Sequence, residues 1–162
     1  MLVLDVMGRV TPESSKTHIR IPFQLDEDCT RLRLKLEYTP KVLKDRKRSL
    51  ELLQQSFDAY LLPEQREPAM SQADHYLPLN NLITLSLDDP LGYRGACHRH
   101  DPIQELTLSA EQASPGLLPR SLPPGDWEVT LSVHSIVTDT CNYSLQVWAE
   151  KGADGINEMA GM

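Results

Sequence analysis

The sequence predicts a mostly β protein: a two-layer antiparallel β-sandwich, jelly-roll-like, with one inserted amphipathic helix at about residues 42–60. Three observations predict it. Apolar and polar residues alternate with a period of two in several segments, as in strands that bury one face. Twelve prolines and eight glycines provide many turns between these segments. A single segment has the 3.6-residue period of a helix.

The first two strand signals run from Ile19 to Leu25 and from Leu32 to Tyr38. Pro22 has no N–H to donate to a neighbouring strand, so we expect the first of these strands to lie at a sheet edge or to carry a bulge there. An acidic turn at residues 26–28 separates the two segments. We expect the two segments to form an antiparallel pair across this turn.

The period changes after Thr39-Pro40. Apolar residues then recur on one helical face, at Leu50, Leu53, Phe57 and Leu61. They predict a helix from Val42 to about Tyr60. Prolines at 63 and 68 predict its end, followed by an exposed loop over residues 62–79. Helix and loop interrupt a run of strands, so we interpret them as an insertion.

Further strands are expected at residues 82–87, 104–109, 127–133 and 143–149. Trp148 points away from the apolar face of the last one, so it is either exposed or packs under the inserted helix, and we favour packing under the helix. The chain is thus predicted to be one domain, residues 1–150. Residues 151–162 have almost no apolar side chains and are expected to form a disordered tail.

Composition and charge argue against several classes of partner. The net charge is −7, and the one basic cluster, at residues 41–48, fits the solvated face of a helix, so we expect no nucleic-acid partner. No apolar run approaches the length that crosses a bilayer, so we expect no membrane contact. Three widely spaced cysteines fit a reducing compartment and predict a cytoplasmic protein.

One segment resembles a metal site. His98, His100 and Asp101 follow one another closely, and alternate residues of an extended segment point to the same side. They are therefore candidate ligands for a divalent metal, with Cys97 as an alternative third ligand. The competing interpretation is a plain surface loop between Gly95 and Pro102. We find no nucleotide-binding or hydrolase motif, and we expect nearby carboxylates to raise the pKa of the Cys29 thiol.

The order of strand motifs resembles a known family. The residues that carry the resemblance are the segment from Thr17 to Lys41, the segment from Leu82 to Ala96, and the turn Pro124-Gly125-Asp126-Trp127. They resemble the N-terminal β-sandwich of carbaryl-hydrolase-like (CehA/McbA-type) metallohydrolases of the PHP superfamily, over about residues 17–149. In that family a metal-binding catalytic domain follows. Here the sequence ends soon after the last predicted strand, so the resemblance implies the accessory part alone and assigns no catalytic residue.

Three functions are therefore weighed. The first is a non-catalytic accessory or interaction module, with a PHP-type metal-dependent hydrolase as the partner that the resemblance implies. The second is a module that binds a small ligand or carbohydrate, as jelly rolls often do. The third is a minimal metalloenzyme that uses His98 and His100. The residues favour the first, and enzyme activity is the least favoured.

Overall fold

The computed structural model describes residues 1–151 and confirms a β-sandwich. The predicted tail lies outside the described residues, except for Lys151. In chain order the elements are β1 (Leu2–Val10), β2 (Thr17–Leu25), β3 (Arg31–Thr39), α1 (Arg46–Tyr60), α2 (Pro63–Ser71), β4 (Leu82–Asp89), β5 (Gly92–Cys97), β6 (Ile103–Ser109), β7 (Gly125–Ser135) and β8 (Cys141–Glu150). Short 3-10 turns follow β1 and α2, at Pro12–Ser14 and Ala73–Tyr76.

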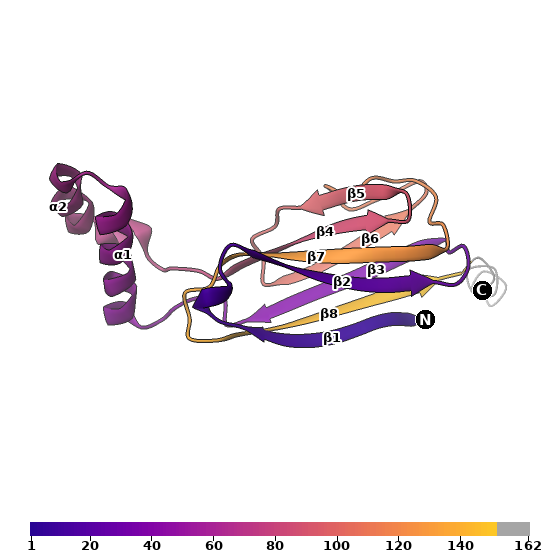
Figure 1. Ribbon diagram of the computed structural model, residues 1–162, viewed down its shortest axis with the longest axis horizontal. Helices are drawn as coiled ribbons and strands as arrows, with labels where there is room; N and C mark the ends of the chain where they lie inside the picture. Colours follow the sequence, from indigo (N-terminus) through magenta and orange to yellow (C-terminus); the bar gives the residue numbers. More distant parts are fainter. Residues whose placement is uncertain (152–162) are drawn as a thin grey trace, which may run out of the picture.

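The strands form two antiparallel sheets in the order β1-β8-β3-β6 and β2-β7-β4-β5 (Figure 1). The pairs β1·β8, β2·β7, β3·β6 and β4·β5 are those of a long hairpin of four strands against four, rolled up on itself. This order is that of a jelly roll, the architecture expected from the sequence. Pro22 lies on β2, an edge strand, also as predicted.

The expected pairing of β2 with β3 is wrong. β2 pairs with β7, whereas β3 pairs with β6 and β8 in the opposite sheet. The acidic turn therefore carries the chain from one sheet to the other. Alternation along a strand shows which face is buried but contains nothing about which strand lies beside it, so the local pattern could not distinguish a hairpin from a crossing between sheets.

A single apolar core fills the space between the two sheets. Its side chains are the inward-facing residues of the alternating segments, as in Leu32, Leu34 and Leu36 of β3, all essentially unexposed. Trp127 lies in this core, stacked on Phe23 with ring centroids 6.0 Å apart. Full burial of side chains of this size stabilises the fold by about 1.5–3 kcal/mol each.

The prediction of an inserted helix is partly right and partly wrong. The insertion contains two helices rather than one, and the first begins at Arg46 instead of Val42. Pro63 occupies the first position of α2, where a missing N–H costs nothing, so it starts a helix in the segment expected to be a loop. The side chain of Asp45 caps α1 by accepting from Arg48 N at 3.0 Å.

The helices stand at one end of the sandwich and cover neither sheet (Figure 1). They have a small apolar cluster of their own, centred on Leu53, Phe57 and Ala73. Two short segments that pair at Val42 and Asn80 connect them to the strands. The predicted packing of Trp148 under the helix is therefore wrong; instead the Arg33 guanidinium lies 5.2 Å from its ring centroid.

The two long sides of the sandwich differ. At one side, the connection from residue 110 to 124 runs along both edge strands, β5 and β6. Leu118 N donates to Arg94 O on β5, and Ser114 N donates to Thr107 O on β6. This connection also buries Leu117. We call this the closed side.

The other long side has the edges of β1 and β2, and no segment of residues 1–151 pairs with either edge. Inward-facing residues of these strands are only partly buried, among them Val3, Leu4 and Val6 of β1 and Ile19 of β2. Their counterparts Leu106 and Leu108 on β6 are almost completely buried. We call this the open side.

Candidate functional site

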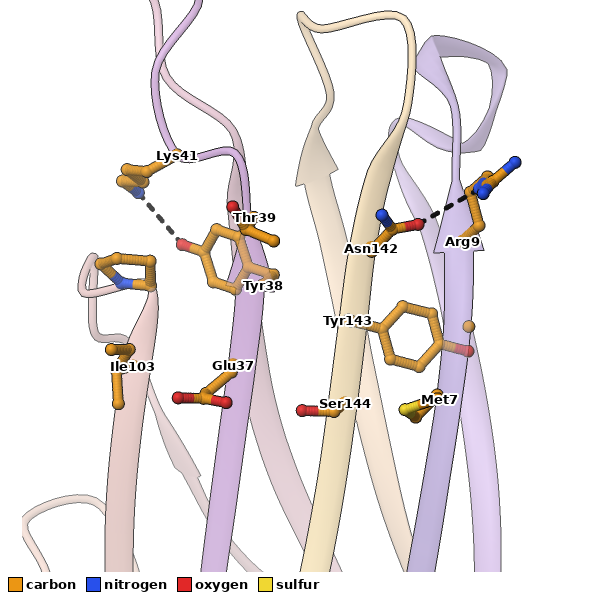
Figure 2. A pocket seen from close by; sticks show the side chains of 12 residues that line it. Met7, Arg9, Glu37, Tyr38, Thr39, Lys41, Ile103, Asn142, Tyr143 and Ser144 are labelled. Atoms are coloured by element: carbon orange, nitrogen blue, oxygen red, sulfur yellow. Dashed lines mark hydrogen bonds between the residues drawn. The ribbon is translucent and has the colours of Figure 1, made fainter.

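A groove of about 930 Å³ crosses the outer face of the β1-β8-β3-β6 sheet at the end that carries the helices (Figure 2). Each of the four strands contributes to it. The residues that line it are Met7, Gly8, Arg9, Glu37, Tyr38, Thr39, Lys41, Pro102, Ile103, Asn142, Tyr143 and Ser144. Its volume lies within the range of small-molecule sites in proteins, roughly 300–1,000 Å³.

Strand register builds the floor of the groove. Met7 lies opposite Ser144, Ser144 opposite Glu37, and Glu37 opposite Ile103, so one row of side chains crosses all four strands. Three strand spacings make this row about 14 Å wide. Figure 2 shows Glu37 and Ser144 between Met7 at one end and Ile103 at the other. The row is polar in the middle and apolar at both ends.

A second row lies beside the first. Arg9 lies opposite Asn142, and Asn142 lies opposite Thr39. Arg9 Nε donates to Asn142 Oδ1 at 3.2 Å, which holds the amide with its nitrogen available to a ligand. Ser144 and Thr39 are short side chains in the centre of the face, and this lowers the floor between longer neighbours.

The helix end of the groove is held by Lys41. Its Nζ donates to Tyr38 Oη at 3.0 Å and to the Asn81 carbonyl at 2.7 Å. Tyr38 Oη in turn lies 3.4 Å from the His100 carbonyl. The Lys41 ammonium and the Tyr38 hydroxyl thus connect β3, the residue before β4 and the loop before β6. These contacts fix the wall of the groove.

Gly8 and Tyr143 make the β1 edge of the groove compact. They face each other across the β1·β8 pair, and a Cβ on Gly8 would lie 2.3 Å from Tyr143 Oη. The tyrosine ring therefore occupies the space that a side chain on Gly8 would need. Glycine is favoured here by the close approach of a side chain rather than by its backbone angle.

The predicted metal ligands lie outside the groove, in the loop between β5 and β6. His98, His100 and Asp101 are all exposed. Within residues 1–151, no group of three or more histidine, cysteine, aspartate or glutamate side chains is placed to hold a metal ion. Cys97, the alternative third ligand, is buried and its Sγ donates to the Pro115 carbonyl at 3.4 Å. A metal at this loop stays a prediction.

The thiols are held in their protonated form. Burial raises the pKa of Cys29 to about 11, and the Asp28 carboxylate adds to this, as the sequence predicts. Burial also raises the pKa of Cys97 and of Cys141. Because the thiolate is the nucleophile, these cysteines are poorly suited to covalent catalysis at neutral pH.

Exposed aromatic side chains lie away from the groove. Tyr93 is at the start of β5, and Tyr76 packs edge-on against Phe57 in the helical insertion. Apolar contacts in the groove come instead from Met7 and Ile103, which are 83% and 57% exposed. Sequence reasoning missed these residues because each is a single side chain on a different strand. Register brings them together, and no local motif marks them.

Comparisons with known proteins do not place the chain in a family. No family model matches the sequence, and no curated protein matches it. Among solved structures, the chain is similar to the crystal structure of GEBA250068378 from Sulfurospirillum deleyianum, with 8% identity and a TM-score of 0.33 over 90% of this chain and 98% of the other. This likeness is too weak to place the chain in a family. Neither described helix has the length and hydrophobicity to cross a membrane.

Proposed function

We propose that this chain is a non-catalytic binding module and that the groove on the β1-β8-β3-β6 sheet is its binding site. The observation that carries the proposal is the groove itself: a concave face of about 930 Å³ with a polar centre and apolar ends. A few convergent polar groups within apolar walls are typical of small-ligand sites.

The ligand class that this groove fits best is a polyhydroxylated molecule, such as a short oligosaccharide. The floor offers acceptors at the Glu37 carboxylate, a donor at the Asn142 amide nitrogen, and hydroxyls at Ser144 and Thr39 that both donate and accept. A sugar needs such a mixture, because each hydroxyl group both donates and accepts. Met7 and Ile103 would then contact the apolar faces of the sugar rings.

The remaining chemistry of the chain favours binding over catalysis. The thiols have raised pKa values, and the groove contains one carboxylate, Glu37, where glycoside hydrolysis uses a pair. Three free cysteines also fit a reducing compartment, so we place the protein in the cytoplasm.

The test is a glycan array followed by thermal shift with the strongest glycan. Ser144→Trp would fill the centre of the groove and abolish binding while leaving the fold intact. Thr130→Trp is the matched control, because Thr130 is a partly exposed residue at the centre of β7, in the other sheet. At a hundredfold excess over Kd, a ligand stabilises the native state by about 2.7 kcal/mol, a shift of several degrees. If no glycan raises the Tm of the unmodified protein, the proposed ligand class is wrong.

The insertion favours a second candidate, the accessory module that docks onto another protein. Tyr60, the last residue of α1, and Leu62, just before α2, are 76% and 58% exposed. The helices that carry them cover neither sheet (Figure 1), and the Tyr60 ring lies 5.9 Å from Lys16 Nζ. The partner implied by the family resemblance is a PHP-type hydrolase. If Tyr60→Ser with Leu62→Ser abolishes co-purification with such a hydrolase while Ser144→Trp does not, this candidate replaces the first.

A further inference from the structure

The edge of β1 on the open side is long, and no segment of residues 1–151 covers it. β1 has nine residues and pairs with β8 on one side only (Figure 1). Natural edge strands are usually short, charged, interrupted by proline or covered. Of the other three edges, β2 contains Pro22, and the connection from 110 to 124 covers β5 and β6. Of these protections β1 has only charged side chains, with neither a proline nor a covering segment from the described residues.

The outward-facing residues of β1 are Asp5, Met7 and Arg9, and all three are exposed. Met7 is in the middle, at 83% exposure, with one acid and one base placed symmetrically around it. No ion pair joins Asp5 to another side chain in residues 1–151. The charge pattern of this strand therefore complements that of a second copy of the same strand running in the opposite direction.

We propose that β1 pairs antiparallel with β1 of a second copy of this chain, centred on Met7. In this register Met7 faces Met7 of the second copy, and each Asp5 faces an Arg9. Two cross-strand pairs of opposite charge form on the outer face, and such pairs stabilise antiparallel sheets. A two-fold axis requires this kind of self-complementary surface.

The inner face of β1 supports the same occupant. Val6 would face Gly8 of the second copy, and Leu4 would face Val10. Val3, Leu4 and Val6 are only partly buried in the single chain, so a neighbouring sandwich would cover apolar surface that the closed side already covers with its own connection. The antiparallel arrangement also sends the two helical insertions to opposite ends, where they do not meet.

The dimer would join the two grooves. The row that crosses the sheet ends at Met7, and Met7 lies on the proposed axis, so the row continues into the same row of the second copy. Eight strands would then carry one trough with two equivalent halves. This inference goes beyond the proposed function and does not depend on what the groove binds.

Charge reversal at two positions tests the register. Asp5→Arg places two like-charged pairs across the interface, and so does Arg9→Asp, so each variant should dimerise at least about tenfold more weakly by analytical ultracentrifugation. A mixture of the two variants restores both opposite-charge pairs, and the expected product is a heterodimer as tight as the unmodified dimer. Glu105→Arg on β6, an exposed residue at the opposite edge of the same sheet, is the control that leaves dimerisation unchanged.

A covalent readout makes the result independent of affinity. Met7→Cys, in a Cys29→Ser background, should form an intermolecular disulfide on mild oxidation, because residue 7 faces itself. Asp5→Cys alone should not, because residue 5 faces residue 9. A monomeric unmodified protein at all concentrations overturns the proposal. So does a dimer that both charge variants leave intact, since that dimer would use another surface.

Discussion

The closed and open sides of this sandwich show two ways of ending a sheet. On the closed side, a connection of about fifteen residues lies along both edges and is fastened by backbone hydrogen bonds. On the open side, β1 forms an uncovered edge whose side chains are exposed or, where they are apolar and face inward, only partly buried. The difference shows that the fold itself does not determine edge protection. It depends on whether a loop has an anchor that holds it against the strands.

On the closed side that anchor is Arg94, which is completely buried. Its guanidinium donates to Asp89 Oδ2 at 3.0 Å and to the carbonyls of Leu118, Arg120 and Ser121 at 2.9–3.0 Å. The group also lies 5.5 Å from the Trp127 ring centroid. A planar, always charged side chain with five donors can satisfy several loop carbonyls at once, which a lysine could not do.

The largest expected effect is at this anchor. Arg94→Met leaves the Asp89 carboxylate buried without its partner and removes the donors of three loop carbonyls, so we expect a loss of about 3–5 kcal/mol in the free energy of unfolding. Arg20→Met on the open side is the matched control, with a change within about 0.5 kcal/mol. Urea denaturation of both variants measures the difference, and similar values would show that Arg94 does not fasten this side.

Glycine substitutions sharpen the comparison further. Gly95 has a φ of 130°, and a Cβ there would lie 2.1 Å from the Gly116 carbonyl oxygen in the connection, so Gly95→Ala should cost about 2–4 kcal/mol. On the open side, Gly8→Ala meets only the Tyr143 side chain, which can rotate away, so the expected cost is about 1 kcal/mol. Equal Tm values for the two variants would contradict the view that the closed side is the more tightly packed one.

The smallest effect concerns alkaline pH. Cys29 N bonds to the Leu122 carbonyl near the end of the connection, and the thiol pKa is raised from 9.0 to about 11 in the folded chain. The stabilising contribution of this shift is therefore fully present below pH 9 and is lost as the pH rises to about 11, because the unfolded thiol ionises first. The free energy of unfolding should fall less over this window in Cys29→Ala than in the unmodified protein. Parallel curves would contradict the raised pKa.

The sequence predicts the sandwich well where strands bury one face completely. Alternation identifies β2, β3, β6, β7 and β8, because every second residue of these strands faces the core and is apolar. β1 was not predicted as a strand. Its register shifts between Leu2 and Leu4, so apolar residues adjoin one another and the period is broken there. Alternation does not predict β5 either, because Gly92 and Gly95 interrupt it; Gly95 is needed where the connection approaches this strand closely.

The candidate site was out of reach for a different reason. Its floor joins Met7, Glu37, Ile103 and Ser144. These residues lie far apart in the sequence, from the first strand of the sandwich to the last. A groove between strands depends on the exact neighbour of each residue, and alternation leaves strand order open. His98 and His100 are candidate ligands because they lie two residues apart in the sequence. The groove, in contrast, is assembled from distant segments.

One feature of the insertion bears on how this protein tolerates change. The chain leaves the sandwich near Val42 and returns near Asn80, and these two residues pair in an isolated antiparallel β-bridge. The two ends of the insertion therefore lie side by side. A segment of another length or sequence between them can start and end at the same place, so the order of the strands does not depend on it. We therefore expect changes in the length or sequence of the helical hairpin to leave the strand order of the jelly roll unchanged.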